Sequence, residues 1–298
     1  MTTFRGTYTV LITPFTSDGS AIDVPALERL VDWQITEGIH GLIPLGSTGE
    51  FLSMTREERQ LVIDTVVRTS NGRVPVLVGT GAEWTRDCVE LSLEAQSMGA
   101  DGVMIIPPFY SCPNEDELFA HYRAVGEAID VPIMLYNNPA TANVDLMPST
   151  VARLAQIDTV RYIKESTLEV TRVRDIIELC GDRMNVFAGI LGYESFWLGA
   201  CGWIAVASNL LPKWSAQMFE AAVERGDRDA ALALYKKILP IVRAVGGPHY
   251  VAASKAGLNL LGLPVGDPRA PRLPLALPHQ LALRQALEDL QVIGSLRS

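Results

Sequence analysis

The 298-residue chain is poor in lysine, cysteine and histidine, and each shortage narrows its possible chemistry. Its four cysteines and four histidines are scattered, with no CxxC, no HExxH and no close pair of histidines. This spacing indicates neither a zinc site nor a disulfide framework, and it disfavours a histidine-based metal site. Lysine occurs only five times.

Clusters of basic residues and long apolar runs are also lacking. The formal net charge is −9, and no stretch concentrates lysine or arginine, so we expect no nucleic-acid partner and no anionic membrane surface. No apolar run approaches the roughly 20 residues of a membrane-spanning helix. The first ten residues do not show a basic segment followed by an apolar one, as a signal peptide would. We therefore expect a cytoplasmic protein.

What the sequence does contain is a repeated alternation of short apolar segments with longer amphipathic ones. Segments that are apolar at nearly every residue are typical of parallel strands covered on both faces. The strands predicted in this way are 8–13, 41–45, 74–78, 102–106, 132–135, 160–164, 185–188 and 202–206.

Eight such units predict an α/β fold of the (β/α)8 TIM barrel class with a C-terminal helical extension. A doubly wound open sheet is the alternative. It is disfavoured because Gly79 and Gly81 follow a strand, but Trp84 stands where the third glycine of a phosphate-binding fingerprint would be. We place the barrel at residues 1–225 and the extension at 226–298. The helices predicted after the last strand are 213–226, 228–245, 249–261 and 275–293.

In barrels of this class the chemistry lies at the C-terminal ends of the strands. At these positions the sequence has hydroxyl groups, tyrosines, glycine-rich turns and one amine, but no histidine and no pair of carboxylates. This set argues against metal-dependent hydrolysis, glycoside hydrolysis and triad acyl transfer. It suits amine catalysis on a carbonyl compound.

The amine is Lys164, which falls within a predicted strand and is the only lysine before residue 213. A buried lysine has two explanations. It could be structural, paired with a neighbouring acid such as Glu165 or extending to the rim of the barrel. Alternatively, an apolar site could keep the amine neutral, so that it adds to a ketone and forms an iminium ion that accepts electrons. A nearby tyrosine hydroxyl, such as that of Tyr136, could then move protons.

Several short motifs resemble those of the dihydrodipicolinate synthase/N-acetylneuraminate lyase family. They are TPF at 13–15, GSTGE at 46–50, PPFY at 107–110, Tyr-x-x-Pro at 136–139, YIKES at 162–166 and GLPVGDPRAP at 262–271. The combination is specific, although no single motif is, and the resemblance covers essentially the whole chain.

The resemblance implies that Lys164 forms a Schiff base with a 2-oxo acid and that Tyr136 transfers protons. Ser47, Tyr136 and Tyr110 would form a hydroxyl relay, with Tyr110 contributed by a neighbouring subunit. The substrate would be bound by residues from several strand ends, namely Thr48, Gly49, Gly189, Asn138, Thr141 and Ser208. Members of this family need no metal or organic cofactor and are commonly homotetramers built as dimers of dimers.

One position departs from the synthase branch of the family. That branch, which condenses pyruvate with aspartate semialdehyde, has an arginine where this chain has Thr141, and threonine cannot form a bidentate ion pair with a carboxylate. We therefore expect aldol cleavage, aldol condensation or dehydration of a hydroxylated 2-oxo acid. The alternatives are 4-hydroxy-tetrahydrodipicolinate synthase itself, a barrel that binds ligands without catalysis, and a phosphate-binding barrel isomerase.

Overall fold

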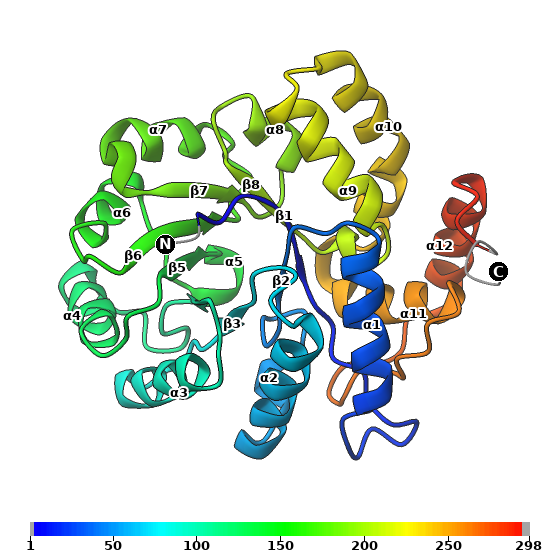
Figure 1. Cartoon of the computed structure of the whole chain (residues 1–298), viewed down its shortest axis with the longest axis horizontal. Helices are drawn as coiled ribbons and strands as arrows, with labels where there is room; N and C mark the ends of the chain where they lie inside the picture. The colour runs from blue at the N-terminus through cyan, green and yellow to red at the C-terminus, as the bar shows by residue number, and fades with distance from the viewer. Residues whose placement is uncertain (1–2, 294–298) are drawn as a thin grey trace. The chain divides into compact units, whose positions relative to one another are not determined.

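A computed structural model of the chain describes residues 3–293, and within them eight parallel strands alternate with helices (Figure 1). This arrangement is the (β/α)8 TIM barrel fold followed by C-terminal helices, and it confirms the predicted fold class. The strands are β1 (Gly6–Val10), β2 (Gly41–Ile43), β3 (Leu77–Gly79), β4 (Gly102–Ile105), β5 (Ile133–Asn137), β6 (Val160–Glu165), β7 (Asn185–Ala188) and β8 (Gly202–Ala205).

The helices that follow the strands differ in length. The α-helices are α1 (Val24–Thr36), α2 (Arg56–Ser70), α3 (Thr85–Ser97), α4 (Glu115–Gly126), α5 (Pro139–Ala142), α6 (Pro148–Leu154), α7 (Thr171–Cys180), α8 (Gly192–Phe196), α9 (Pro212–Phe219), α10 (Arg228–Ala244), α11 (Tyr250–Leu260) and α12 (Leu277–Asp289). Short helical turns include η1 (Phe51–Ser53), η3 (Ala207–Asn209) and the π-helical η4 (Glu220–Glu224).

The chain forms two compact units. Unit 1 comprises Pro75–Ile204 together with the described residues up to Gly6, and unit 2 comprises Thr7–Val74 together with the described residues from Ala205 onward. This division differs from a simple boundary between barrel and extension, because unit 2 joins the first part of the chain to its last part.

Unit 1 is built on consecutive parallel pairs from β3 to β8. The register places Tyr136 of β5 beside Lys164 of β6, and Lys164 beside Phe187 of β7. The helices α3, α4, α6 and α7 lie outside these strands and pack against one another in sequence order (Figure 1). β5 is fully buried and β6 exposes only Arg161, as their apolar sequences predict.

Unit 2 contains β2 paired with most of β1, and several of its helices pack against one another. Helix α1 packs against α2, α9 against α10, and α12 against both α10 and α11. The four helices predicted after residue 210 are therefore confirmed as α9 with η4, α10, α11 and α12.

The helix boundaries follow local signals in the sequence. Thr55 caps α2 in a capping box with Glu58, and Asn71 ends this helix in the left-handed conformation. Asn114 caps α4 in the same way, and three acidic residues occupy the first turn of that helix.

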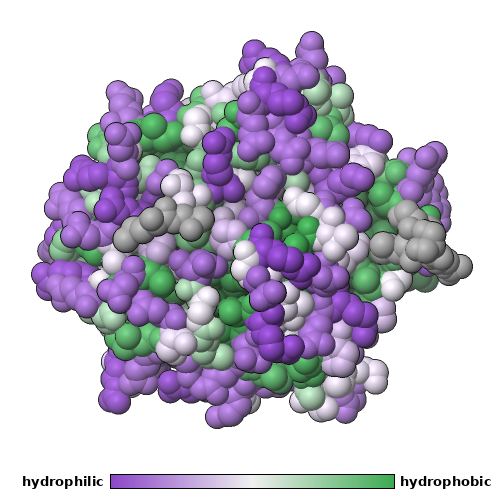
Figure 2. Space-filling model, viewed as in Figure 1, coloured by the Kyte–Doolittle hydropathy of each residue, from purple (hydrophilic) through white to green (hydrophobic). Residues whose placement is uncertain are grey.

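The face shown in Figure 2 is mostly hydrophilic, with hydrophobic patches between the hydrophilic residues. Among residues 3–293, no helix is both long enough and apolar enough to cross a membrane.

Candidate functional site

Lys164 is buried in unit 1, with 5% of its surface exposed. Its Nζ atom lies 4.0 Å from the centre of the Tyr136 ring, because the two residues are register partners on β5 and β6. Within the described part of the chain, the side-chain amine of Lys164 takes part in no ion pair and no hydrogen bond. A buried amine without a counter-charge is costly for a purely structural lysine.

Glu165 is not the partner of Lys164. Its carboxylate accepts hydrogen bonds from Asn137 Nδ2 at 2.9 Å and from the backbone N–H of Thr167 at 2.8 Å. The side chains of adjacent strand residues point to opposite faces of the sheet, so the side chains of Lys164 and Glu165 cannot form an ion pair with each other. The structural explanation based on Glu165 is therefore excluded.

The hydroxyl of Tyr136 is positioned by the side chain two residues further on. Asn138 Nδ2 donates a hydrogen bond of 2.9 Å to Tyr136 Oη, and the backbone of Asn138 begins the short helix α5. Because Oη acts as an acceptor in this bond, the phenolic proton remains available for transfer. Asn138 was predicted from the resemblance to bind substrate, and its contact with Tyr136 was not foreseen.

A polar network holds the other face of the same two strands. Asn137 Oδ1 accepts the backbone N–H of Leu146 at 2.9 Å, while its amide binds Glu165. Asp145 accepts a 2.8 Å bond from Arg172, whose side chain is 8% exposed. The pKa of Asp145 is lowered by this hydrogen bond, although burial opposes the change. The network fixes the strand ends that carry Tyr136 and Lys164.

Ser166 is a further candidate that the sequence alone did not reveal. It is 5% exposed, and its hydroxyl is one of the buried polar groups without a hydrogen-bond partner among the described residues. Its backbone N–H bonds to the carbonyl of Asn137 at 2.9 Å and so continues the pairing of β6 with β5 by one residue. The alternation of the strand, extended to Ser166, places it on the same face as Lys164. A Cβ atom at Gly189 would lie 1.8 Å from Ser166 Oγ, so only glycine fits at this position.

Tyr110 lies in the loop after β4 and is 87% exposed. The loop backbone is nevertheless held firmly, because the Glu83 carboxylate accepts the N–H groups of Phe109, Tyr110 and Ser111 at 2.8–2.9 Å. Asn143 donates to the carbonyl of Phe109 at 2.9 Å. The exposed phenol is thus presented on an ordered loop.

The predicted carboxylate-binding loop, Ser47-Thr48-Gly49, lies in unit 2. Within its turn, the N–H of Gly49 bonds to Gly46 and the N–H of Glu50 bonds to Ser47. The Gly49 carbonyl accepts the hydroxyl of Thr13, and a Cβ atom at Gly49 would lie 2.8 Å from the carbonyl oxygen of Leu11. Gly49 is therefore needed for close backbone approach, and its role with substrate stays a prediction.

The two remaining predicted residues have partners of their own. Ser208 is fully buried in unit 2, and its hydroxyl donates to the carbonyl of Ala205 at 2.7 Å. Thr141 is exposed on α5 in unit 1, and its hydroxyl donates to the carbonyl of Asn138 at 3.3 Å. Their roles in substrate binding stay predictions.

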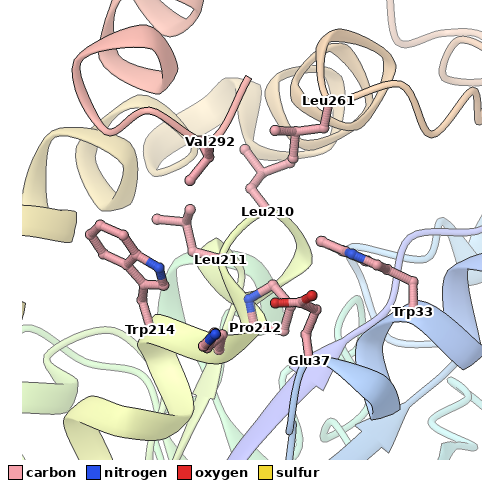
Figure 3. Close-up of a pocket in the computed structure, with 9 residues that line it drawn as sticks. Trp33, Glu37, Leu210, Leu211, Pro212, Trp214, Leu261 and Val292 are labelled. Atoms are coloured by element: carbon pink, nitrogen blue, oxygen red, sulfur yellow. The ribbon is translucent and has the colours of Figure 1, made fainter. Parts of the chain in front are cut away.

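Unit 2 also contains a small cavity of about 60 Å³ (Figure 3). It is lined by Trp33, Glu37, Leu210, Leu211, Pro212, Lys213, Trp214, Leu261 and Val292, none of which was a predicted site residue. Two tryptophans and several aliphatic side chains line it together with the charged residues Glu37 and Lys213, and the Glu37 carboxylate is directed toward Pro212 (Figure 3). Across residues 3–293, no cluster of three or more His, Cys, Asp or Glu side chains is arranged to hold a metal ion.

Comparisons with known proteins identify the family of the chain. Residues 3–290 match the model of the Dihydrodipicolinate synthetase family. A 4-hydroxy-tetrahydrodipicolinate synthase from Pelobacter propionicus is 38% identical over 91% of this chain and 93% of its own length.

Two solved structures give the same result. The dihydrodipicolinate synthase from Acinetobacter baumannii, complexed with pyruvate, has a TM-score of 0.94 and 34% identity, covering 98% of this chain and 100% of that one. YagE from E. coli K12 is a prophage protein of the dihydrodipicolinic acid synthase family, solved in complex with pyruvate. It has a TM-score of 0.91 and 32% identity, and the match covers 97% of this chain and 99% of that one.

The fold and these likenesses define the chain as an enzyme of the class I lyases, which work through a Schiff base. It belongs to the dihydrodipicolinate synthase family, as the family match across nearly its whole length shows.

Proposed function

We propose that the enzyme acts on pyruvate or another 2-oxo acid through an iminium ion formed at Lys164. The neutral amine adds to the ketone carbon, and the resulting carbinolamine loses water to give the iminium. An enamine then forms in one of two ways. The carbon next to the iminium carbon loses a proton, or its bond to the hydroxyl-bearing carbon beyond it breaks, the hydroxyl loses its proton and the departing fragment leaves as a carbonyl compound. The observation that carries this proposal is the buried Lys164 amine, which lies over the Tyr136 ring and has no counter-charge among the described residues.

Tyr136 serves as the proton-transfer group in this scheme. Dehydration of the carbinolamine needs an acid, and formation of the enamine needs a base. The phenol can fill both roles in turn, since it lies beside Lys164 and its oxygen is held in place by the hydrogen bond from Asn138.

Ser166 provides a contact for the part of the substrate beyond the ketone. Its unpartnered hydroxyl lies on the Lys164 face of β6, next to Gly189. A hydroxylated 2-oxo acid offers a hydroxyl that this group can bind, whereas pyruvate does not. This favours cleavage or dehydration of a longer hydroxylated 2-oxo acid.

The remaining roles rest on the family resemblance. The Thr48 hydroxyl and the amides of its loop would bind the substrate carboxylate, and the Ser47 hydroxyl would extend the relay. The high exposure of Tyr110 supports its contribution to a second subunit, and thus a homotetrameric assembly. Cytoplasmic residence also stays a prediction, as do the proposed contacts of Thr141 and Ser208.

The second candidate is 4-hydroxy-tetrahydrodipicolinate synthase, which condenses pyruvate with aspartate semialdehyde. It is favoured by the names of the relatives, including the one 38% identical to this chain. Thr141 weighs against it, because an exposed threonine offers no cation to a second carboxylate.

The proposal is tested by incubating the protein with pyruvate and borohydride, which reduces an iminium to a stable amine, and by measuring the intact mass. We expect the mass of one reduced pyruvate per chain in the wild type and none in Lys164→Met. Turnover of a panel of hydroxylated 2-oxo acids, measured beside condensation with aspartate semialdehyde, then separates the two candidates. Condensation faster than turnover of every other substrate would favour the second.

A further inference from the structure

A second buried lysine in the described chain, Lys255 of α11, pairs with the acid that ends the GSTGE loop. Lys255 Nζ lies 2.9 Å from Glu50 Oε1, and the two side chains are 1% and 0% exposed. Lys255 also donates to the carbonyl of Asp267 at 3.0 Å and lies 4.0 Å from the centre of the Phe15 ring. All four residues belong to unit 2.

The backbone of Glu50 has a conformation that residues other than glycine seldom adopt. Its φ of 59° and ψ of 38° lie in the left-handed region, where a residue with a side chain is strained. Its second carboxylate oxygen accepts the backbone N–H of Arg269 at 3.0 Å and lies 4.0 Å from the guanidinium of Arg272. The surrounding contacts therefore compensate the strain.

This arrangement brings together three motifs that are far apart in the sequence. The Arg269 guanidinium lies 4.2 Å from the centre of the Phe15 ring, so the TPF phenylalanine contacts two cations. The backbone N–H of Phe15 bonds to the carbonyl of Val265, and Thr13 donates to the Gly49 carbonyl. The TPF, GSTGE and PVGDPRAP segments thus form one framework around the Glu50 carboxylate.

We infer that the Lys255–Glu50 ion pair positions the Ser47-Thr48-Gly49 loop for binding the carboxylate of a 2-oxo acid. The inference rests on the proposed function, in which that loop binds the substrate. Within the turn, the N–H groups of Gly49 and Glu50 already bond to Gly46 and Ser47, which leaves those of Ser47 and Thr48 to bind an anion. Rotation of Glu50 out of its left-handed conformation would redirect both amides.

Lys255 is a positioning residue and not a second nucleophile. Burial lowers its pKa to about 8, although Glu50 opposes the change, and a lowered pKa is also a property of reactive lysines. However, its amine is enclosed and is occupied by Glu50 and by the Asp267 carbonyl. Borohydride should therefore trap pyruvate on Lys164 and not on Lys255.

The test compares the pyruvate concentration that gives half-maximal borohydride trapping in Lys255→Met, Glu50→Gln and the double variant. We expect this pyruvate concentration to rise about tenfold or more in each variant, which is the usual effect of losing a hydrogen bond to a charged group. Trapping at saturating pyruvate should stay complete. Either single variant leaves an unpaired buried group, but the double variant leaves no net buried charge and should fold. The matched control is Lys237→Met, which removes an exposed lysine whose Nζ lies 3.8 Å from the centre of the Trp214 ring. In this control, the pyruvate concentration for half-maximal trapping should stay within about twofold of the wild-type value.

Amide hydrogen exchange gives a readout that does not depend on catalysis. The peptide containing residues 46–50 should exchange faster in the double variant than in wild type or Lys237→Met. Unchanged half-saturation in a folded Lys255 or Glu50 variant would overturn the inference while leaving the Schiff base in place. Failure of the wild type to be trapped, together with faster exchange in the variant, would instead remove the proposed function and retain the positioning of the loop.

Discussion

Asn138 donates its side-chain amide to the hydroxyl of Tyr136 at 2.9 Å, within two residues of the same strand end. The contact fixes the phenol that lies beside Lys164 and leaves the phenolic proton free to move. It links a residue expected only to contact substrate with the group expected to perform proton transfer.

Replacing Tyr136 with phenylalanine should lower turnover by roughly 10²- to 10⁴-fold, the usual contribution of a positioned acid–base group. The ring remains, so the packing against Lys164 is retained. Steady-state kinetics with the best 2-oxo acid substrate, together with circular dichroism to confirm folding, provides the measurement. An unchanged turnover number would remove Tyr136 from the mechanism.

Replacing Asn138 with alanine should lower turnover about tenfold, because one hydrogen bond to the reacting hydroxyl is lost. The effect should disappear in the Tyr136→Phe background, since the two residues act as one unit. Ala140→Ser, an exposed change on the same short helix, serves as the control and should retain wild-type turnover. Equal losses in both backgrounds would show that Asn138 acts independently of Tyr136.

The fold could be predicted from the sequence because its signals are local. Each strand is a short apolar segment, and caps such as Thr55 and Asn114 mark the starts of helices. Lys164 stood out because lysine is rare in a buried strand. Strand alternation could also have shown that Glu165 faces away from Lys164.

Other parts of the site depend on contacts that sequence spacing does not reveal. Glu50 and Lys255 are 205 positions apart in the chain, and no local pattern connects them. Lys255 was therefore assigned only to the helical extension. Ser166 was missed because its importance lies in having no partner, which is a property of the packed structure.

The loop that carries Tyr110 should depend on Glu83. Replacing Glu83 with alanine removes the acceptor of three backbone N–H groups, so amides 109–111 should exchange at least about tenfold faster. Turnover should fall as well if Tyr110 completes a neighbouring site. Glu127→Gln, an exposed change at the residue that follows α4, is the control and should leave exchange in the loop unchanged.

The same loop should loosen in acid. Burial raises the pKa of Glu83, but hydrogen bonds from Ser111, Tyr110 and Phe109 outweigh it and lower the pKa below its ordinary value of 4.5. The stabilisation is therefore present above pH 4.5 and is lost as the pH falls through the lowered pKa. Protection of amides 109–111 that is equal at pH 3 and pH 6 would contradict this account.

His121 should make the stability of the protein depend on pH between about 4 and 6.5. Its burial lowers the pKa to about 4, and its Nδ1 contacts the Thr85 hydroxyl at 2.9 Å. The unfolded chain binds a proton below pH 6.5 while the folded chain does not, so stability falls as the pH falls through this range. Between pH 7.5 and 5 the loss should be about 2 kcal/mol.

Urea unfolding at the two pH values measures this effect in wild type and in His121→Phe. The variant keeps an aromatic ring against Tyr122 but cannot titrate. Its free energy of unfolding should therefore fall less between pH 7.5 and 5 than that of wild type. An identical fall in the two proteins would assign the dependence to other groups.

The central claim, a Schiff base at Lys164, is tested most directly by locating the adduct. After reduction with borohydride in the presence of pyruvate, the protein is digested and its peptides are mapped by mass. The account predicts one modified peptide, the one that contains Lys164, and an unmodified peptide containing Lys255. A label on any other lysine, or no label with pyruvate and a broad set of 2-oxo acids, would contradict it.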